Sequence, residues 1–236
     1  MALRPIFISS IKDSSLVKEQ LIEFDWSPGF SISQKQKSID SLHRSALING
    51  FPKVLEISSK SRALLGIQLS ALNLKLKIDE TIEGTIESIY QGSKVFEYGG
   101  PFTELYYLAS REARKSEQLY NSGKLINFSL KDEIWGLLPE SLFYDWLYVN
   151  ALTQSKLLAE EIMEFDTFTD IEFNPQRQYS CQARSAALFV SLVKTEMLER
   201  YIESKGNLGT ILVPKKRMIQ ETLDFTDCQQ PSYSPK

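Results

Sequence analysis

The stretch TIESIYQGSKVF, residues 85–96, sets a carboxylate, an amide and an amine at helical intervals. We expect a helix over 85–96, in which Glu87, Gln91 and Lys94 share one face because residues three and four apart are neighbours. On that face Glu87 can transfer a proton, Gln91 can hold a polar ligand edge, and Lys94 can pair with a phosphate or act as a nucleophile. A solvated polar stripe is the commoner meaning of this spacing, so spacing alone assigns no site.

The segment FEYGGP, residues 96–101, follows directly. Glycine lets the backbone come close to a neighbour and adopt conformations that other residues avoid. We therefore expect a turn over 99–101 in which Gly99 allows the backbone to approach a ligand. The turn would then direct the chain into a helix over 103–121.

A second polar stretch is FTDIEFNPQRQYSCQARSAA, residues 168–187. Two residues two apart on an extended segment point to the same side, and a residue before proline is extended or in a turn. A polar loop is the commoner meaning of such a sequence. Carboxylates, an amide and an arginine nevertheless suit a nucleotide or sugar site, where a carboxylate stabilises an oxocarbenium-like transition state or activates water. The candidates in this stretch are Asp170, Glu172, Asn174, Gln182 and Arg184.

Two further stretches leave a structural and a functional interpretation open. In LEISSKSRALLGIQLSALNL, residues 55–74, Lys60 and Arg62 stand in a serine-rich turn that either cradles phosphate oxygens or is a polar connection. In FYDWLY, residues 143–148, the aromatics either stack on a base or belong to the core. The core is the commoner interpretation, because Phe143, Trp146 and Leu147 fit one helix face.

The composition excludes several classes of protein. A net charge of −3 and a pI of about 5.4 argue against a protein that coats nucleic acid. One histidine and two separated cysteines disfavour a metal site and a disulfide framework, and no apolar run is long enough to span a membrane. The start MALRPIFISS lacks the apolar core of a signal peptide, so we expect a cytoplasmic protein. Walker-type, dinucleotide-binding and nucleophile-elbow motifs are missing.

Periodicity predicts a mainly helical α+β domain over residues 1–209. Ser33 and Gln36 fit a capping box for a first helix that Gly50 ends. Pro139 suits the first turn of the helical region 141–165. After Gly209 the sequence is polar, and we expect residues 210–236 to be an appendage with a loose end. The other expected elements are strands over 5–10, 53–59 and 69–78 and a last helix over 182–203.

Taken in order, four of these segments resemble the NADAR superfamily, also called YbiA-like. LGIQLSALNL (65–74) stands at the family's Ser-Asn-Phe element, with Ala71 in place of the usual Asn. ESIYQGSKVF (87–96) is similar to the family signature Glu-x-x-Tyr/Phe-Gln-x-x-Lys-Phe, FTDIEFNP (168–175) to its late Val-Glu segment, and CQARSAAL (181–188) to the start of its final helix. The resemblance covers residues 24–200. LEISSKS and YQGSKVFEYGGPFTELY further resemble the NADAR antitoxins encoded beside DarT-type DNA ADP-ribosyltransferase toxins.

The resemblance implies a single-domain YbiA-like fold and an N-glycosidic hydrolase that needs no cofactor. Relatives in the antitoxin branch remove ADP-ribose from guanine in DNA, while other relatives cleave riboflavin-pathway intermediates. Lys94 would form a Schiff base, with Lys60 as the rival amine and Glu87 or Asp170 moving protons; direct attack by water is the alternative mechanism. The DarT-type toxin would be a functional rather than an obligate physical partner, and a non-catalytic antitoxin that binds ADP-ribose or the toxin stays open. The implied substrate-binding residues also include Tyr90, Asn73 and Ser70.

Overall fold

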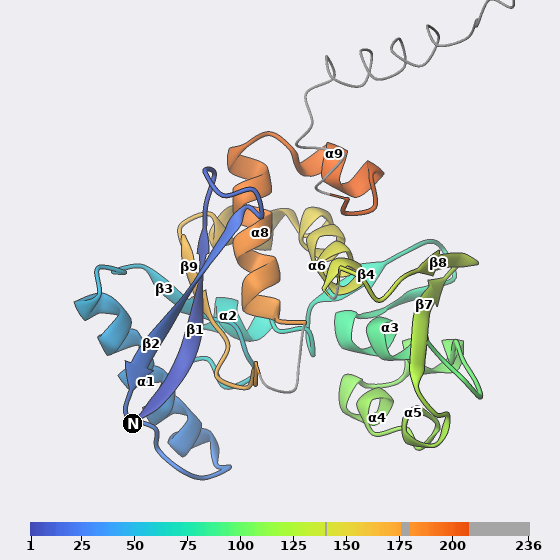
Figure 1. The fold of residues 1–236 in the computed structure, drawn as a ribbon, viewed down its shortest axis with the longest axis horizontal. Helices are drawn as coiled ribbons and strands as arrows, with labels where there is room; N and C mark the ends of the chain where they lie inside the picture. Colours follow the sequence, from blue (N-terminus) through green and yellow to red (C-terminus); the bar gives the residue numbers. More distant parts are fainter. Residues whose placement is uncertain (140, 176–179, 208–236) are drawn as a thin grey trace, which may run out of the picture.

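The computed structural model describes residues 1–139, 141–175 and 180–207. One side of the fold is a four-stranded sheet with the order β2-β1-β9-β3 (Figure 1). β1 (Ala2–Ser9) and β2 (Val17–Phe24) form an antiparallel hairpin. β9 (Thr167–Thr169) lies between β1 and β3 (Val54–Glu56), antiparallel to the first and parallel to the second. Because β3 and β9 are parallel, the residues that follow them leave the sheet at the same edge.

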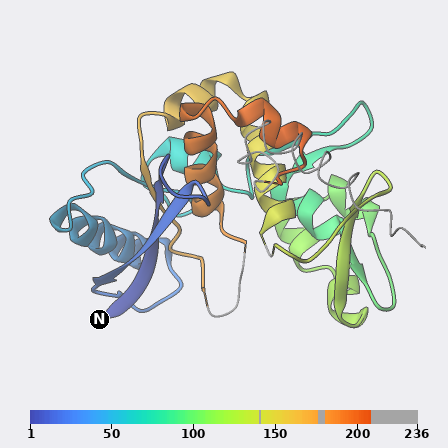
Figure 2. The ribbon, with the colours of Figure 1, turned by 45° about the horizontal axis from the view of Figure 1, so that its top comes forward.

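Two helices cover the opposite faces of this sheet (Figures 1 and 2). Successive side chains of a strand point to opposite faces. In β1, Ile6 packs with residues of α1 (Ile32–Ile48), and Phe7 packs in the larger core with residues of α8 (Gln182–Lys194). The alternation in β1 therefore anchors both helices to the sheet.

The other side of the fold is built around α3 (Ile86–Gly92) and a three-stranded sheet. That sheet has the order β6-β7-β8, and α6 (Leu142–Gln154) packs between it and α8 (Figure 2). The buried face of α6 is aromatic: the Phe143 ring lies 4.9 Å from that of Phe128, centroid to centroid. The strands are β6 (Lys94–Phe96), β7 (Leu125–Leu130) and β8 (Glu133–Trp135).

The remaining elements are short. They are α2 (Leu64–Gln68), β4 (Lys75–Lys77), β5 (Glu83–Thr85), the 3-10 helix η1 (Thr103–Tyr107), α4 (Ser110–Arg114), α5 (Gln118–Asn121), α7 (Lys156–Ile162) and α9 (Leu198–Glu203).

None of the helices in the described ranges is long and apolar enough to cross a membrane. Cys181 is a free, buried cysteine, whereas Cys228 lies outside the described residues.

The expected α+β, mainly helical fold is confirmed, but the helix predicted over 85–96 is too long. It ends at Gly92, and Lys94 begins β6. A Cβ atom on Gly92 would lie 2.6 Å from the Tyr106 ring, so only glycine lets these two segments pack this closely. Beyond it, Val95 and Phe96 are β-branched and aromatic residues that pair with β7, which overrides the helical spacing.

The first helix ends as predicted but begins differently. Its N-cap is Ser31, whose hydroxyl accepts a hydrogen bond from the Gln34 N–H, so the expected capping box at Ser33 is wrong. Gly50 follows the last turn with a φ of +91°, as the C-terminal glycine rule predicts. Pro139 precedes α6, which begins at Leu142, and does not lie in its first turn.

Three other predicted elements are shorter in the structure. The helix expected over 103–121 is divided into η1, α4 and α5, and the one expected over 182–203 is divided into α8 and α9. Glu196, with a φ of +55°, lies in the second break, where a left-handed residue cannot continue a right-handed helix. Of the strand expected over 69–78, only Lys75–Lys77 is extended, because Leu69–Leu74 form turns instead. The predicted appendage, 210–236, lies outside the described residues.

Candidate active site

Lys94 is joined to Glu87 through a single amide. Its Nζ donates to Gln91 Oε1 at 2.7 Å, and Gln91 Nε2 donates to Glu87 Oε1 at 2.9 Å. The Lys94 Nζ also lies 5.0 Å from the centroid of the Tyr90 ring. The helix α3 supplies three of these side chains and the start of β6 supplies the lysine, so the residues meet although the helix ends before Lys94. The Lys94 amine thus faces the Gln91 amide oxygen and the Tyr90 ring. Gln91 stands between the amine and the Glu87 carboxylate.

This environment weakens the hold of Lys94 on its proton. Burial lowers the pKa of Lys94 to about 8, and the negative charge of Glu87 opposes the shift. The positive charge of Arg114 acts in the same direction as burial. Arg114 lies on α4, with its Nε 3.9 Å from Glu87 Oε1. A substantial fraction of Lys94 is therefore a neutral amine near pH 7–8, as a nucleophilic lysine requires.

Two further carboxyl groups, those of Glu56 and Asp170, lie where β3 and β9 end. Glu56, the last residue of β3, is buried; its Oε2 accepts from Thr169 Oγ1 at 2.6 Å and its Oε1 from the Ile171 N–H at 2.9 Å. Asp170 follows β9 and accepts from the Glu172 N–H at 3.0 Å. Burial raises the pKa of Asp170 to about 8, and the neighbouring Glu56 adds to the shift. Burial also raises the pKa of Glu56. This carboxyl pair consequently retains a proton at neutral pH.

The single histidine of the chain, His43, contacts the carboxyl pair indirectly, through Thr169. His43 Nε2 lies 2.9 Å from Thr169 Oγ1, whose own hydrogen goes to Glu56. The His43 ring must therefore donate from Nε2, which fixes its tautomer. Burial lowers the pKa of His43 to about 4, so the ring is neutral at physiological pH.

Hydrogen bonds of the Ala71 backbone connect the segment that carries Glu87 with the segment that carries Glu56. The Ala71 N–H donates to Gln182 Oε1 at 2.8 Å, and its carbonyl accepts from the Glu87 N–H at 3.0 Å. Gln182 Nε2 in turn donates to the Ile57 carbonyl at 2.7 Å, just beyond Glu56. The Tyr90 hydroxyl adds a contact of 3.3 Å with that of Ser180. α3, the end of β3 and the start of α8 are thereby held in one arrangement.

A family model described as the DarT1-associated NADAR antitoxin matches residues 2–221 of the chain. The chain belongs to this family. The match confirms the family that the ordered motifs predict, and it extends beyond residues 24–200 at both ends. A search of the curated proteins found no match.

The signature positions of this NADAR chain lie together. Glu87, Tyr90, Gln91 and Lys94 form the hydrogen-bonded and ring-stacked group described above, and Gln182 is linked to it through Ala71. Ala71 takes part in these hydrogen bonds through its backbone N–H and carbonyl. Asn73 Nδ2 donates to the Ile67 carbonyl at 2.8 Å and so secures the turn itself.

Other predicted positions make different contacts. Ser70 Oγ accepts from the Leu72 N–H at 3.3 Å inside its turn. Lys60 Nζ donates to Ser59 Oγ at 3.2 Å, in the loop after β3, and takes no part in the chain from Lys94 to Glu87. The approach of the turn over 99–101 to a ligand stays a prediction. Gly100, with a φ of +93°, packs so near the Lys94 carbonyl that a Cβ would lie 2.2 Å from its oxygen, so the turn approaches Lys94 itself.

Three further candidates, Glu172, Arg184 and Trp146, bond to residues outside the network of Lys94, Gln91 and Glu87. Asp170 and Glu172 do not share an extended segment, because both lie in a turn that is closed by the Phe173 N–H and the Asp170 carbonyl. Their involvement with substrate stays a prediction. Glu172 pairs with Lys35 at 3.2 Å, Asn174 follows in the same loop, Arg184 pairs with Asp145 and Ser141, and Trp146 Nε1 donates to the Ile202 carbonyl at 3.2 Å.

Two participants escape the sequence patterns. Glu56 is the only acid in the β-branched run KVLEISS, and a carboxylate inside an apolar strand is a signal of a buried polar role. Arg114 gives no such signal, because it comes from a short helix whose approach to α3 depends on tertiary packing.

Proposed function

We propose that this NADAR antitoxin is a hydrolase that removes ADP-ribose from guanine bases of DNA by cleaving the N-glycosidic bond. The observation that carries the proposal is the buried amine of Lys94, with its lowered pKa, joined through Gln91 to Glu87 at the family's signature positions. Membership of a family of DarT1-associated antitoxins supports the choice of substrate, because a DarT-type toxin attaches ADP-ribose to DNA.

The proposed reaction begins with opening of the ribose ring, which makes the anomeric carbon an imine of the guanine exocyclic nitrogen. Neutral Lys94 attacks this carbon, and guanine leaves with its nitrogen restored to an amine. Asp170, which keeps a proton at neutral pH, supplies the proton for the leaving nitrogen. Water, activated by Glu87, then hydrolyses the Schiff base on Lys94 and frees ADP-ribose.

The decisive test uses purified protein and an oligonucleotide that carries ADP-ribosylated guanine, with no toxin present. Release of free ADP-ribose and recovery of unmodified guanine, measured by mass spectrometry, are expected. Binding without release would instead mean a non-catalytic ADP-ribose reader. Protection of DNA only when the toxin is present would mean neutralisation by direct binding. A parallel incubation with N-glycosidic riboflavin-pathway intermediates tests the other branch of the superfamily, and faster turnover of those would contradict the proposed substrate.

The pH dependence of the reaction follows from Lys94. Its pKa is about 8, so we expect kcat/KM to rise with pH toward that value as the amine loses its proton, and to fall at higher pH as the proposed acid Asp170, whose pKa is also about 8, loses its own. The positive charge of Arg114 lowers this pKa. In Arg114→Gln the rising limb should therefore move to higher pH. A rising limb that stays in place in Arg114→Gln, or that is missing from the wild-type profile, would contradict the assignment of Lys94 as the titrating nucleophile.

A further inference from the structure

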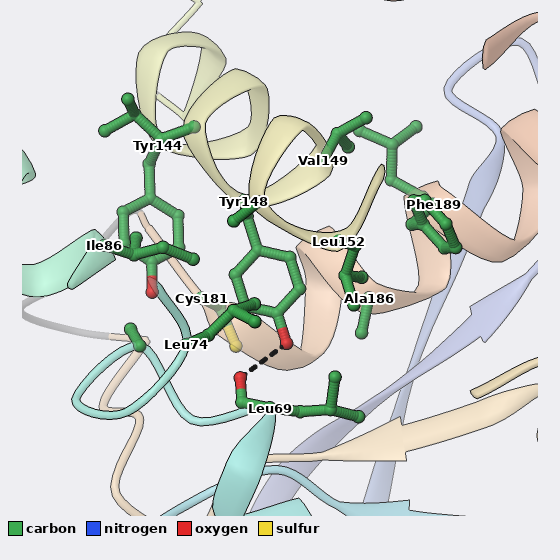
Figure 3. Packing of buried hydrophobic residues seen from close by; sticks show 14 of the residues in the cluster. Leu69, Leu74, Ile86, Tyr144, Tyr148, Val149, Leu152, Cys181, Ala186 and Phe189 are labelled. Atoms are coloured by element: carbon green, nitrogen blue, oxygen red, sulfur yellow. Dashed lines mark hydrogen bonds between the residues drawn. The ribbon is translucent and has the colours of Figure 1, made fainter. Parts of the chain in front are cut away.

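Tyr144 stands out among the buried polar groups of the core. It lies on the first turns of α6 and is only 6 % exposed. A buried tyrosine hydroxyl normally has a hydrogen-bond partner. No hydrogen bond of the Tyr144 hydroxyl is found among the residues that the structure describes, and because its oxygen is not one of the fully enclosed unpaired polar atoms, it keeps a small area open to solvent. Figure 3 shows it pointing away from α6 with no bond drawn, whereas the hydroxyl of Tyr148, one turn further along, donates to the Leu69 carbonyl at 2.8 Å.

The surroundings of this hydroxyl belong to the candidate active site. The Tyr144 ring packs edge-to-face on Tyr90 at 5.2 Å between centroids, and Tyr90 is the ring on which Lys94 Nζ lies. Burial raises the pKa of the phenol well above its ordinary value, and the carboxyl groups of Glu87 and Asp170, when ionised, add to the shift. At physiological pH this phenol is neutral and can serve only as a hydrogen-bond donor or acceptor.

We propose that the Tyr144 hydroxyl donates a hydrogen bond to a ribose oxygen of the substrate, beside the Tyr90 ring that Lys94 contacts. The proposal rests on the proposed glycohydrolase function and adds a contact that none of the sequence motifs indicates. A ribose oxygen becomes more negative as the ring opens, so a donor at this point is stronger in the transition state than in the ground state. The unpaired hydroxyl is then explained as a group whose partner is the ligand.

The test compares Tyr144→Phe with Tyr148→Phe, which remove the same atom one helical turn apart. We expect Tyr144→Phe to keep the wild-type Tm and to lose about 10- to 100-fold in kcat/KM, mainly in kcat. Tyr148→Phe leaves the Leu69 carbonyl without its donor, so it should lower Tm while the folded enzyme keeps its kcat. The substrate is the oligonucleotide carrying ADP-ribosylated guanine, assayed across pH 6–9.

The possible results distinguish failure of this proposal from failure of the proposed function on which it rests. If wild-type protein releases no ADP-ribose, the proposed function fails. If wild-type protein is active and Tyr144→Phe is within twofold of it, the hydroxyl contributes nothing and the inference fails alone. A fall in Tm in Tyr144→Phe as large as that in Tyr148→Phe would also overturn it, because the hydroxyl would then serve the fold. Loss of kcat at an unchanged Tm and an unchanged pH profile supports it.

Discussion

Lys94→Ala is expected to reduce ADP-ribose release by about 10³-fold or more, because the proposed covalent route cannot proceed without the amine. The variant removes the amine proposed to form the Schiff base while leaving Glu87 and Gln91 in place. Borohydride added during turnover of the wild-type protein should reduce that intermediate and leave a covalent adduct. Peptide mass spectrometry should locate the adduct on Lys94.

Two matched variants distinguish the roles open to this lysine. Lys94→Arg keeps a positive charge for phosphate binding but cannot form a Schiff base, so it should be as inactive as Lys94→Ala. Lys60→Ala removes the rival amine, which bonds only to Ser59 within the described residues, and should keep most of the activity. Full activity in Lys94→Ala, or an adduct on Lys60, would contradict the assignment. Activity retained in Lys94→Arg would mean that the lysine binds phosphate.

Asp170→Asn is expected to make the protein less active and more stable. The folded-state pKa of Asp170 is raised to about 8, whereas in the unfolded chain it is close to 4. As pH rises from about 4 to 8, the unfolded chain releases a proton that the folded protein keeps, so folding loses stability over this window. Asparagine has no proton to release and avoids that loss. The stability gain should therefore be small at pH 4 and on the order of a few kcal/mol at pH 8.

Urea unfolding at pH 4.5 and pH 8 measures this difference, and ADP-ribose release measures the activity. Loss of the proton donor should cost about 10²- to 10⁴-fold in kcat. Asp170→Ala is the control, since it removes the charge but also the acceptor for the Glu172 N–H, and should gain less stability. An Asp170→Asn variant whose stability tracks that of wild type at both pH values would show that Asp170 is ionised in the folded protein.

The sequence predicts the signature group for a physical reason. Glu87, Gln91 and Lys94 lie within eight residues, so local geometry brings them together even though the helix stops at Gly92. The early end of that helix is not readable from the sequence, because it depends on the Tyr106 ring, which comes from a separate segment.

Contacts between residues far apart in the chain are not predicted either, because they too depend on how separate segments pack. Glu56 and Asp170 are far apart in the chain, and only the parallel pairing of β3 with β9 places them at one edge of the sheet. Strands of three residues are too short for their hydrophobic periodicity to predict such a pairing. The sequence gives no sign of the role proposed for Tyr144 either, since an aromatic run such as FYDWLY most often forms core, and most of it does here.

The position of β9 has a consequence for how the protein is made. β9 is the last strand of the residues that the structure describes, yet it lies between β1 and β3, which leave the ribosome more than a hundred residues earlier. Until residues 167–169 arrive, β1 has no partner on that side, and Glu56 has neither Thr169 nor the Ile171 N–H. Such late, non-local pairing slows folding. A nascent or truncated chain that stops before β9 would contain Lys94 and still lack Asp170, so the proposed site is complete only when nearly all of the described residues have been synthesised.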